Sequence, residues 1–161
     1  MTIELNEAAT QLAEAMGLES GDHIFTWYDE VTGESTHYNV SKLERMVKDG
    51  TAECFQVEVP LNQHLHDYMV KNRGIENAYL ERISEERLME PSFGFVKQST
   101  PTENRILIID GHHRQVKRWH KGLKSAPVLI FSPAAINSVL VSFPKAFSDF
   151  LVQKTKEENG R

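Results

Sequence analysis

The chain has 161 residues, of which 40% are hydrophobic and 25% charged, and its formal net charge is −5 at pH 7. This composition is typical of a globular domain with its own hydrophobic core, and the acidic balance argues against a surface devoted to nucleic acid. The chain has no apolar run of roughly 18 residues, no secretory-signal pattern and too few cysteines for an internal disulfide, so we expect a cytoplasmic protein without membrane association.

The first fifty residues predict a helix, a hairpin and a second, short helix. Apolar residues recur at helical spacing over residues 3–16. Residues 23–28 and 36–40 have the composition of strands and flank a turn-like segment. Ser41 is the expected N-cap of the helix that follows, because a glutamate stands three residues later, as in a capping box.

The middle of the chain alternates strand-like and helix-like segments, which predicts an α/β unit over residues 51–133. Four strands and three helices are expected there: strands over 54–60, 93–98, 105–110 and 126–131, and helices over 64–72, 75–90 and 112–121. In the first of these strands, Phe55, Val57 and Val59 alternate with polar residues, which is typical of a half-buried strand. The strand over 105–110 is apolar on consecutive positions, so we expect it to be central and covered on both faces.

The whole chain is therefore expected to form a single domain over residues 1–161. Its expected fold class is α/β (α+β), a small mixed sheet flanked by helices. Residues 1–50 would add an N-terminal helix and hairpin to the core over 51–133, and residues 134–161 would add C-terminal helices.

The segment most informative about function is ILIIDGHHR, residues 106–114. A strand there runs into a glycine and then into a helix, whose first N–H groups lack intrahelical partners and carry partial positive charge. Open α/β sheets usually bind ligands at such a junction, and Gly111 would let the backbone approach a ligand closely. The pattern predicts a phosphate site, with His113, Arg114 and Lys117 as further donors.

Two features of this segment have alternative interpretations. Asp110 could hold a metal ion, accept a proton or cap the helix. Residues 112–124 contain five Lys or Arg, three His and no acidic residue, which is typical of either an anion-binding track or a solvated helix face. The two adjacent histidines do not have the spacing of helical zinc ligands.

The segment ILIIDGHHRQVKRWHKGLKSAPVLIF, residues 106–131, resembles the signature of the ParB/sulfiredoxin superfamily. In that signature a strand ends in a glycine-containing turn, a His-Arg or similar basic pair opens a helix, and a second hydrophobic strand follows. Residues 57–65 resemble the entry strand of the same fold, and residues 83–98 resemble the helix, proline and strand that precede the signature. The resemblance covers about residues 55–131.

The DGHHR form is most similar to ParB-like nucleases and to the ADP-dependent free-serine kinase. The resemblance implies a protein that binds ATP or ADP, or alternatively CTP, with Mg²⁺, and that carries out phosphoryl transfer or hydrolysis. The phosphate contacts that it implies, together with those from the residue pattern, are Gly111, His112, His113, Arg114, Lys117 and Asn62. The expected catalytic residues are Asp110, His113 and Asp67, and Asp110 would also be the Mg²⁺ ligand.

The chain departs from the superfamily pattern at two places. Sulfiredoxins have a cysteine at the position of His112, so sulfinic acid reduction is not expected. The serine kinase has a glutamate base shortly after its first core strand. Here Asp67 is the nearest carboxylate, and His64 and His66 are alternative bases.

Two further functions fit the sequence. The first is a DNA-binding protein or metal-dependent nuclease of plasmid or phage type. The anion site would then take a backbone phosphate, and the track would continue over Arg118, Lys121 and Lys124. The second is a non-catalytic adaptor that binds a host protein through the aromatic residues of the hairpin, unless these pack into the core: Trp27, Tyr28 and Tyr38.

Overall fold

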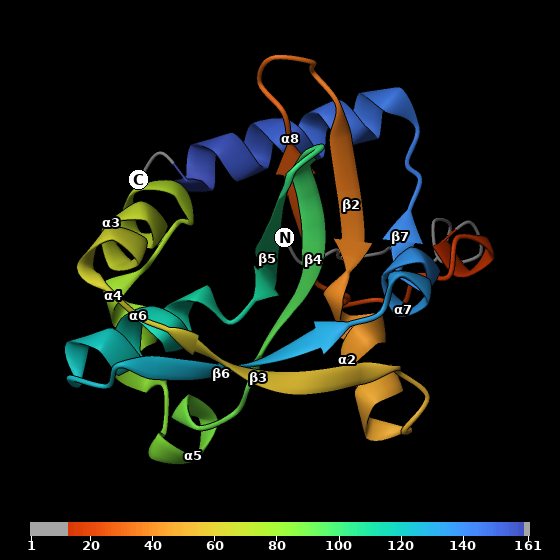
Figure 1. Ribbon diagram of the computed structural model, residues 1–161. Coiled ribbons are helices and arrows are strands. Elements are labelled where there is room, and N and C mark those ends of the chain that lie inside the picture. The colour runs from red at the N-terminus through yellow and green to blue at the C-terminus, as the bar shows by residue number, and fades with distance from the viewer. Residues whose placement is uncertain (1–12, 160–161) are drawn as a thin grey trace. The chain divides into compact units, whose positions relative to one another are not determined.

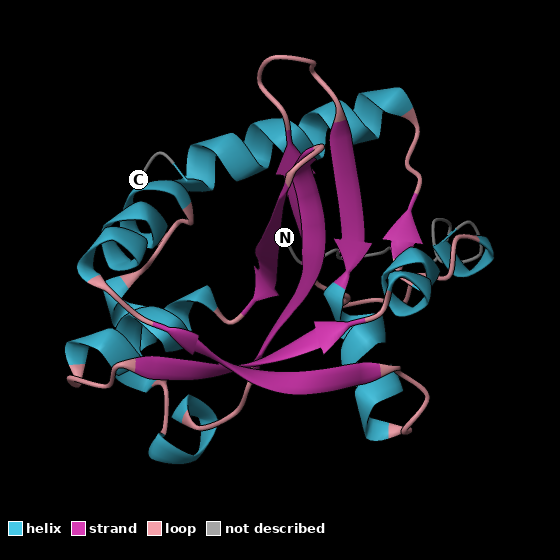
Figure 2. Ribbon diagram, viewed as in Figure 1, coloured by secondary structure: helices cyan, strands magenta, loops and turns pink. Residues whose placement is uncertain are grey.

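The computed structural model describes residues 13–159 and has the expected mixed α+β class. Helices and strands occur in both of two compact units (Figures 1 and 2). The hairpin unit takes the chain up to Glu53 and again from Pro133 to Lys156, and the sheet unit takes Cys54–Ser132 with the end of the last helix. The sheet unit nearly coincides with the core expected over residues 51–133. No helix within the described range is both long and apolar enough to span a bilayer.

The hairpin unit contains a three-stranded antiparallel sheet in the order β1-β2-β7. Its strands are β1 (Ile24–Tyr28), β2 (Ser35–Asn39) and β7 (Leu140–Val141), and its helices are α2 (Val40–Lys48), α7 (Pro133–Ser138) and α8 (Lys145–Asn159). The hairpin that the sequence predicted over 23–28 and 36–40 is confirmed. The helix expected over 3–16 falls mostly on residues outside the described range, although residues 13–15 are helical.

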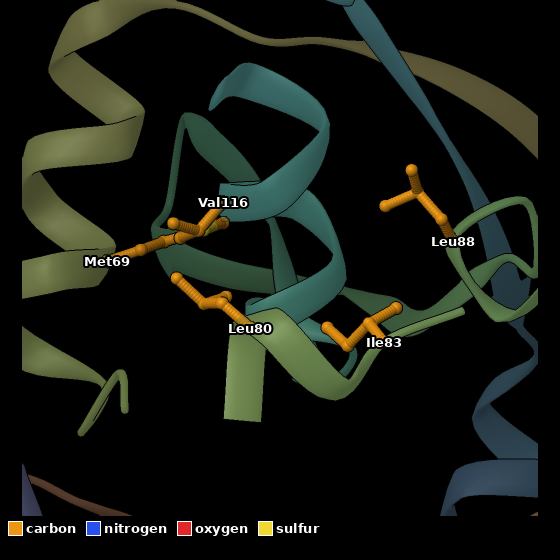
Figure 3. Close-up of a cluster of buried hydrophobic side chains, with 5 residues drawn as sticks. All are labelled: Met69, Leu80, Ile83, Leu88 and Val116. Carbon is orange, nitrogen blue, oxygen red and sulfur yellow. The ribbon is translucent and has the colours of Figure 1, made fainter. Parts of the chain in front are cut away.

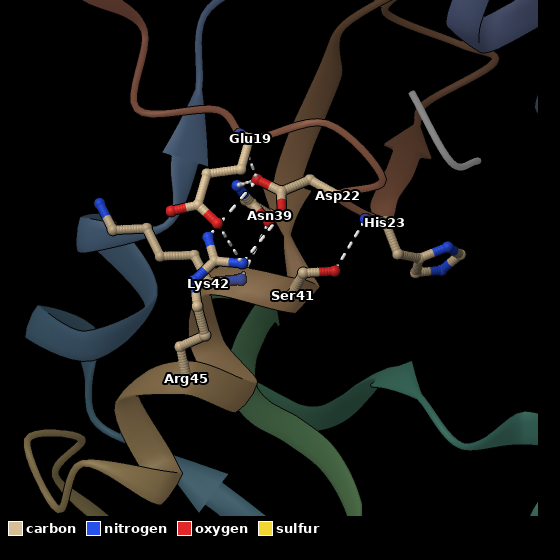
Figure 4. Close-up of polar contacts among 7 residues, drawn as sticks. All are labelled: Glu19, Asp22, His23, Asn39, Ser41, Lys42 and Arg45. Carbon is tan, nitrogen blue, oxygen red and sulfur yellow. Dashed lines mark hydrogen bonds and ion pairs between the residues drawn. The ribbon is translucent and has the colours of Figure 1, made fainter. Parts of the chain in front are cut away.

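A buried carboxylate, Asp22, ties the start of β1 to α2 (Figure 4). It accepts hydrogen bonds from Nη1 of Arg45 at 2.9 Å and from Nδ2 of Asn39 at 2.8 Å. Burial raises the pKa of Asp22, but its hydrogen bonds, led by that from Arg45, lower the pKa more, and the net direction is downward. The expected cap at Ser41 is wrong. Asn39 caps α2, because its side chain accepts from the N–H of Lys42, and the Ser41 hydroxyl instead accepts from the N–H of His23.

The sheet unit contains a four-stranded mixed sheet in the order β3-β6-β4-β5. Its strands are β3 (Cys54–Pro60), β4 (Ser92–Thr100), β5 (Glu103–Asp110) and β6 (Ser125–Phe131), and its helices are α3 (Gln63–Asn72), α4 (Asn77–Arg82), α5 (Glu85–Leu88) and α6 (His112–His120). Strands β4 and β6 are parallel, and the other pairs are antiparallel. In β3, the partly buried Val57 and Val59 follow the expected alternation, but Phe55 is 62% exposed.

The expectation that residues 105–110 form a central strand covered on both faces is wrong. That segment is β5, which lies at the edge of the sheet beside β4. Of its four consecutive apolar residues only Ile109 is buried, and Ile106 is 43% exposed. The central position next to β4 belongs to β6, whose apolar run is almost entirely buried. A consecutive apolar run thus marks the buried strand in one case and an edge strand in the other.

The single helix expected over 75–90 is two short helices, α4 and α5. The chain turns extended at Ile83, and Ser84 begins the second helix by accepting a hydrogen bond from the N–H of Arg87 at 3.1 Å. The apolar residues still reach one core. A cluster of buried side chains from α3, α4, α5 and α6 joins these helices (Figure 3): Met69, Leu80, Ile83, Leu88 and Val116. This cluster fixes the position of α6 and therefore of the DGHHR segment.

Candidate functional site

A β-bulge sets the direction of the chain immediately before the DGHHR segment. Phe93 pairs with Asp110, but the next residue on β4, Gly94, pairs with Ile108, so Ile109 is the additional residue on β5. The Ile109 side chain is buried there. The bulge therefore anchors the strand end in the core, one residue before the candidate carboxylate.

Helix α6 begins at Gly111, whose φ of 98° lies in the left-handed region. A side chain at this position would collide with the Ser92 hydroxyl and would bring its Cβ within 2.9 Å of Nη2 of Arg114. Gly111 has no side chain that could accept from the N–H groups of His113 and Arg114, the usual partners of a capping residue. The N-terminus of α6 therefore lacks a side-chain cap and carries partial positive charge.

Asp110 is not the helix cap, because it precedes the capping position. Its Oδ2 lies 3.4 Å from Nη2 of Arg114. The Asp110 side chain keeps 25% of its surface exposed, so a cation or substrate can reach the carboxylate. Of the three roles that the sequence allowed for Asp110, the role of helix cap is therefore wrong, and the roles of metal ligand and proton acceptor remain.

The Arg114 side chain is enclosed and makes its contacts within the sheet unit. It is 9% exposed, and its Nη2 donates to the carbonyl of Pro91 at 3.1 Å as well as to Asp110. Its Nη1 lies 3.8 Å from a carboxylate oxygen of Glu90. The guanidinium that was expected to bind phosphate therefore holds Asp110 against the segment that leads into β4.

His113 is a neutral imidazole with a defined tautomer. Its Nε2 accepts a hydrogen bond from the N–H of Glu76 at 3.2 Å, so the ring proton resides on Nδ1. Burial lowers the pKa of His113, against the opposing charges of Glu76 and Asp110. The ring also stands edge-to-face against Tyr79, with centroids 4.6 Å apart. His113 can therefore donate from Nδ1 near the start of α6 without carrying a charge.

Two further basic side chains of α6, Lys117 and Arg118, donate to backbone carbonyls. Nζ of Lys117 donates to the carbonyl of Ile83 at 2.7 Å, which is where α4 ends. The buried Arg118 donates to the carbonyls of Leu88 and Ser125. Lys121, in the turn after α6, pairs with Glu85. These basic side chains thus connect α6 to α4, α5 and β6. Lys124 lies on the exposed surface.

Two of the expected site residues lie on α3 rather than at the N-terminus of α6. Asn62 caps α3, because its side chain accepts from the N–H of Leu65 at 2.8 Å. Asp67 belongs to a polar cluster that reaches His120, the last residue of α6. Helix α6 has nine residues and is about 13.5 Å long. The structure therefore brings Asp110 and His113 together and places Asp67 near the opposite end of that helix.

Two histidine constellations were not predicted from the sequence. His66 and His120 face each other with their Nε2 atoms 2.9 Å apart, although 54 residues separate them in the chain. In the hairpin unit, the buried His37 is hydrogen-bonded to the hydroxyls of Thr26 and Ser148, at 2.9 and 2.7 Å. The His66–His120 and His37–Ser148 contacts join residues that are distant in the chain, and no local spacing rule could have indicated them.

Comparison of the chain with protein-family models, with curated proteins and with solved structures found no match. The likeness to the ParB/sulfiredoxin superfamily therefore rests on the sequence signature and stays a prediction.

Proposed function

We propose that the sheet unit binds the phosphate groups of ATP or ADP at the N-terminus of α6 and carries out phosphoryl transfer or hydrolysis there. The observation that supports this most is the start of α6 at Gly111, where a left-handed glycine leaves the first helical turn without a side-chain cap. A phosphate is the anion that such a turn accommodates best, because several N–H groups and the helix dipole point toward it.

The neighbouring side chains suit this chemistry in separate roles. His113 would donate a neutral N–H from Nδ1 to a phosphate oxygen, which follows from its acceptor bond to the N–H of Glu76. Arg114 would act through Asp110, since its guanidinium holds that carboxylate. Phosphoryl transfer depends mostly on positioning and charge stabilisation, which these contacts would supply.

The implied Mg²⁺ ion fits the residues present. Within residues 13–159 no three His, Cys, Asp or Glu side chains converge as a complete ligand set. Mg²⁺ does not need such a set when nucleotide is bound, because it commonly takes one or two carboxylates, phosphate oxygens and water. Asp110 would be that carboxylate, and the ion would neutralise charge on the phosphates.

The alternative of a DNA track along α6 has less support. Arg118 is buried against two carbonyls, and Lys121 is paired with Glu85. Of the three side chains expected to extend the track, Lys124 alone lies on the surface without such a described contact. The adaptor alternative also loses one of its three aromatic residues, because Tyr38 is buried in the core of the hairpin unit.

The proposal is tested by calorimetric titration with ATP, ADP and CTP, each with Mg²⁺, on the full chain and on His112→Glu. A glutamate in the first turn of α6 complements the helix dipole and should preserve the fold, but its charge occupies the phosphate position. We expect the wild-type protein to bind ATP or ADP and His112→Glu to lose that binding. Asn104→Glu is the matched control, since it adds the same charge on the exposed part of β5. Equal binding by the two variants, or no nucleotide binding at millimolar concentration, would reject the proposal.

Catalysis is tested separately with Asp110→Asn. This variant should still bind nucleotide but lose most of the Mg²⁺-dependent release of phosphate, because a neutral amide oxygen binds Mg²⁺ more weakly than a carboxylate and does not neutralise its charge. Retention of full Mg²⁺-dependent turnover would show that Asp110 has no part in the chemistry.

A further inference from the structure

Helices α3 and α6 bring two histidines together at a place that the phosphate site does not use. The helices pack through Met69 and Val116, which belong to one buried cluster (Figure 3). His66 precedes Met69 by three residues and His120 follows Val116 by four, so each histidine lies one turn along the same helix face as its apolar neighbour. The packing of the two helices therefore imposes the approach of the two imidazoles.

The two rings face each other through their nitrogen atoms. Nε2 of His66 lies 2.9 Å from Nε2 of His120, and the ring centroids are 5.0 Å apart at 57°. Two imidazoles that bind one Zn²⁺ tetrahedrally at 2.0–2.1 Å have their nitrogens about 3.3 Å apart. A widening of about 0.4 Å, within the reach of small side-chain rotations, and a shift of the His120 ring proton from Nε2 to Nδ1 through solvent would convert the observed pair into a pair of ligands.

A carboxylate fixes the tautomer that metal binding requires. Oδ1 of Asp67 lies 3.0 Å from Nδ1 of His66, so Nδ1 holds a proton and the lone pair of Nε2 points toward His120. Nε2 of Gln63 donates to the same Asp67 oxygen at 2.7 Å and holds the carboxylate in place. A carboxylate that orients a metal-binding histidine through its second ring nitrogen is a recurrent feature of metal sites.

The chemistry of the pair selects the class of ion. Imidazole nitrogens suit Zn²⁺ and its neighbours Ni²⁺ and Cu²⁺, whereas Mg²⁺ and Ca²⁺ prefer oxygen ligands. No third His, Cys, Asp or Glu completes a ligand set within the described part of the chain. His120 is exposed, so water or a small ligand can fill the remaining positions from solvent.

We propose that His66 and His120 form a binding site for a divalent transition-metal ion such as Zn²⁺, with Asp67 orienting His66 and with coordination positions open to solvent. The site is independent of the proposed phosphate site, because it lies at the opposite end of α6. The sequence pattern did not predict this site, because His66 and His120 are 54 residues apart in the chain. Asp67 was instead expected to be a catalytic residue of the phosphate site.

Calorimetric titration of the full chain with Zn²⁺ tests the site. We expect one equivalent to bind, His66→Ala and His120→Ala each to abolish that binding, and Asp67→Ala to weaken it by about tenfold or more. His64→Ala is the matched control, since His64 is exposed on the same helix and lies outside the cluster, and it should bind Zn²⁺ as the wild type does. His112→Glu should also bind normally, which separates this site from the phosphate site.

A second readout locates the ion. The Trp119 ring lies 6.5 Å from the His66 ring, so Cu²⁺ bound at the pair should quench the fluorescence of Trp119 in a Trp27→Phe background. The quenching should disappear in His66→Ala and His120→Ala. If Zn²⁺ does not bind, or if both alanine variants bind it as His64→Ala does, the contact is a hydrogen bond between histidines only and the proposed site does not exist.

Discussion

Arg114 lies in the first turn of α6 with its side chain almost fully enclosed, and its described contacts are to other parts of the sheet unit. The guanidinium links the carbonyl of Pro91 to the carboxylates of Asp110 and Glu90. Removing a buried charge with such partners is destabilising mainly because the carbonyl and carboxylates that it contacted lose their hydrogen-bond donor or ion-pair partner. The same contacts hold the candidate carboxylate, so stability and site geometry are joined at this residue.

We predict that Arg114→Ala lowers the free energy of unfolding by about 3 kcal/mol, because it leaves Asp110 and the Pro91 carbonyl without their donor. Arg114→Lys should recover little of this loss, since a single ammonium cannot reproduce the forked contact. Urea unfolding measures both effects.

Arg87→Ala is the control for this prediction. Arg87 is about half exposed and lies 3.9 Å from Glu90, so its removal should change the stability by less than about 0.5 kcal/mol. Equal stability of the Arg114 and Arg87 variants, combined with loss of nucleotide binding in the first alone, would assign Arg114 to the ligand, as the sequence pattern had predicted.

Strands β5 and β6 show that the position of a strand in the sheet determines whether its consecutive apolar residues are buried. Both segments read as buried strands in the sequence, but β6 lies between β3 and β4 and β5 lies at the edge. On β5, burial is concentrated at Ile109, the bulge residue, whereas Ile106 pairs with Val96 on a largely exposed face. Because β5 lies at the edge of the sheet, most of its apolar side chains contribute little to the core.

The same substitution at two positions of β5 should have unequal effects. Ile109→Thr places a hydroxyl and a smaller side chain in the core and should cost about 3 kcal/mol of unfolding free energy. Ile106→Thr keeps a β-branched side chain on the exposed face and should cost less than about 1 kcal/mol. Chemical denaturation of both variants measures the difference. Equal losses would mean that β5 is covered on both faces.

The sequence predicted the existence and type of most elements because their periodicity is local. Boundaries and connections depended on contacts that periodicity does not contain. The helix expected over 75–90 breaks at Ile83. Ser84 caps a new helix there, and Lys117 donates a hydrogen bond to the carbonyl of Ile83. Ser41 fitted a capping box, but Asn39, two residues earlier, begins the helix instead, because its side chain accepts from the N–H of Lys42.

The strand-glycine-helix geometry of the candidate site was also predictable, because it depends on adjacent residues. The roles of the basic side chains were not, since charge patterning does not reveal whether a carbonyl lies within reach. Lys117 and Arg118 donate hydrogen bonds to backbone carbonyls, and His66 and His120 meet across two helices. Long-range packing decided each of these outcomes.

At the scale of the whole molecule, each of the two units encloses a histidine. His37 is buried in the hairpin unit and His113 is half-buried in the sheet unit. Burial lowers the pKa of both, although Glu76 and Asp110 oppose this effect at His113. In the unfolded chain both would titrate near their usual pKa of about 6.5. The unfolded state therefore binds protons more readily than the folded state as the pH falls below that value.

We predict that the protein loses stability between pH 7.5 and pH 5, since each histidine with a lowered folded pKa favours the unfolded chain once the pH falls below about 6.5. Asp22, whose pKa is lowered from 3.8, contributes at more acidic pH and does not affect this window. Unfolding free energies measured across the range should fall as the pH falls. His37→Gln should give a shallower dependence. A dependence that is flat, or that rises toward acid, would contradict the burial of these neutral imidazoles.

The central claim is that the first turn of α6 binds phosphate through its backbone. Its most direct test is titration of ¹⁵N-labelled protein with ATP and Mg²⁺, monitored through the amide resonances. We predict that the amides of Gly111, His113 and Arg114 shift most and saturate together, because phosphate oxygens accept from this turn. Shifts confined to Lys124 and other exposed basic residues, or no shift in this turn at millimolar ATP, would contradict the account.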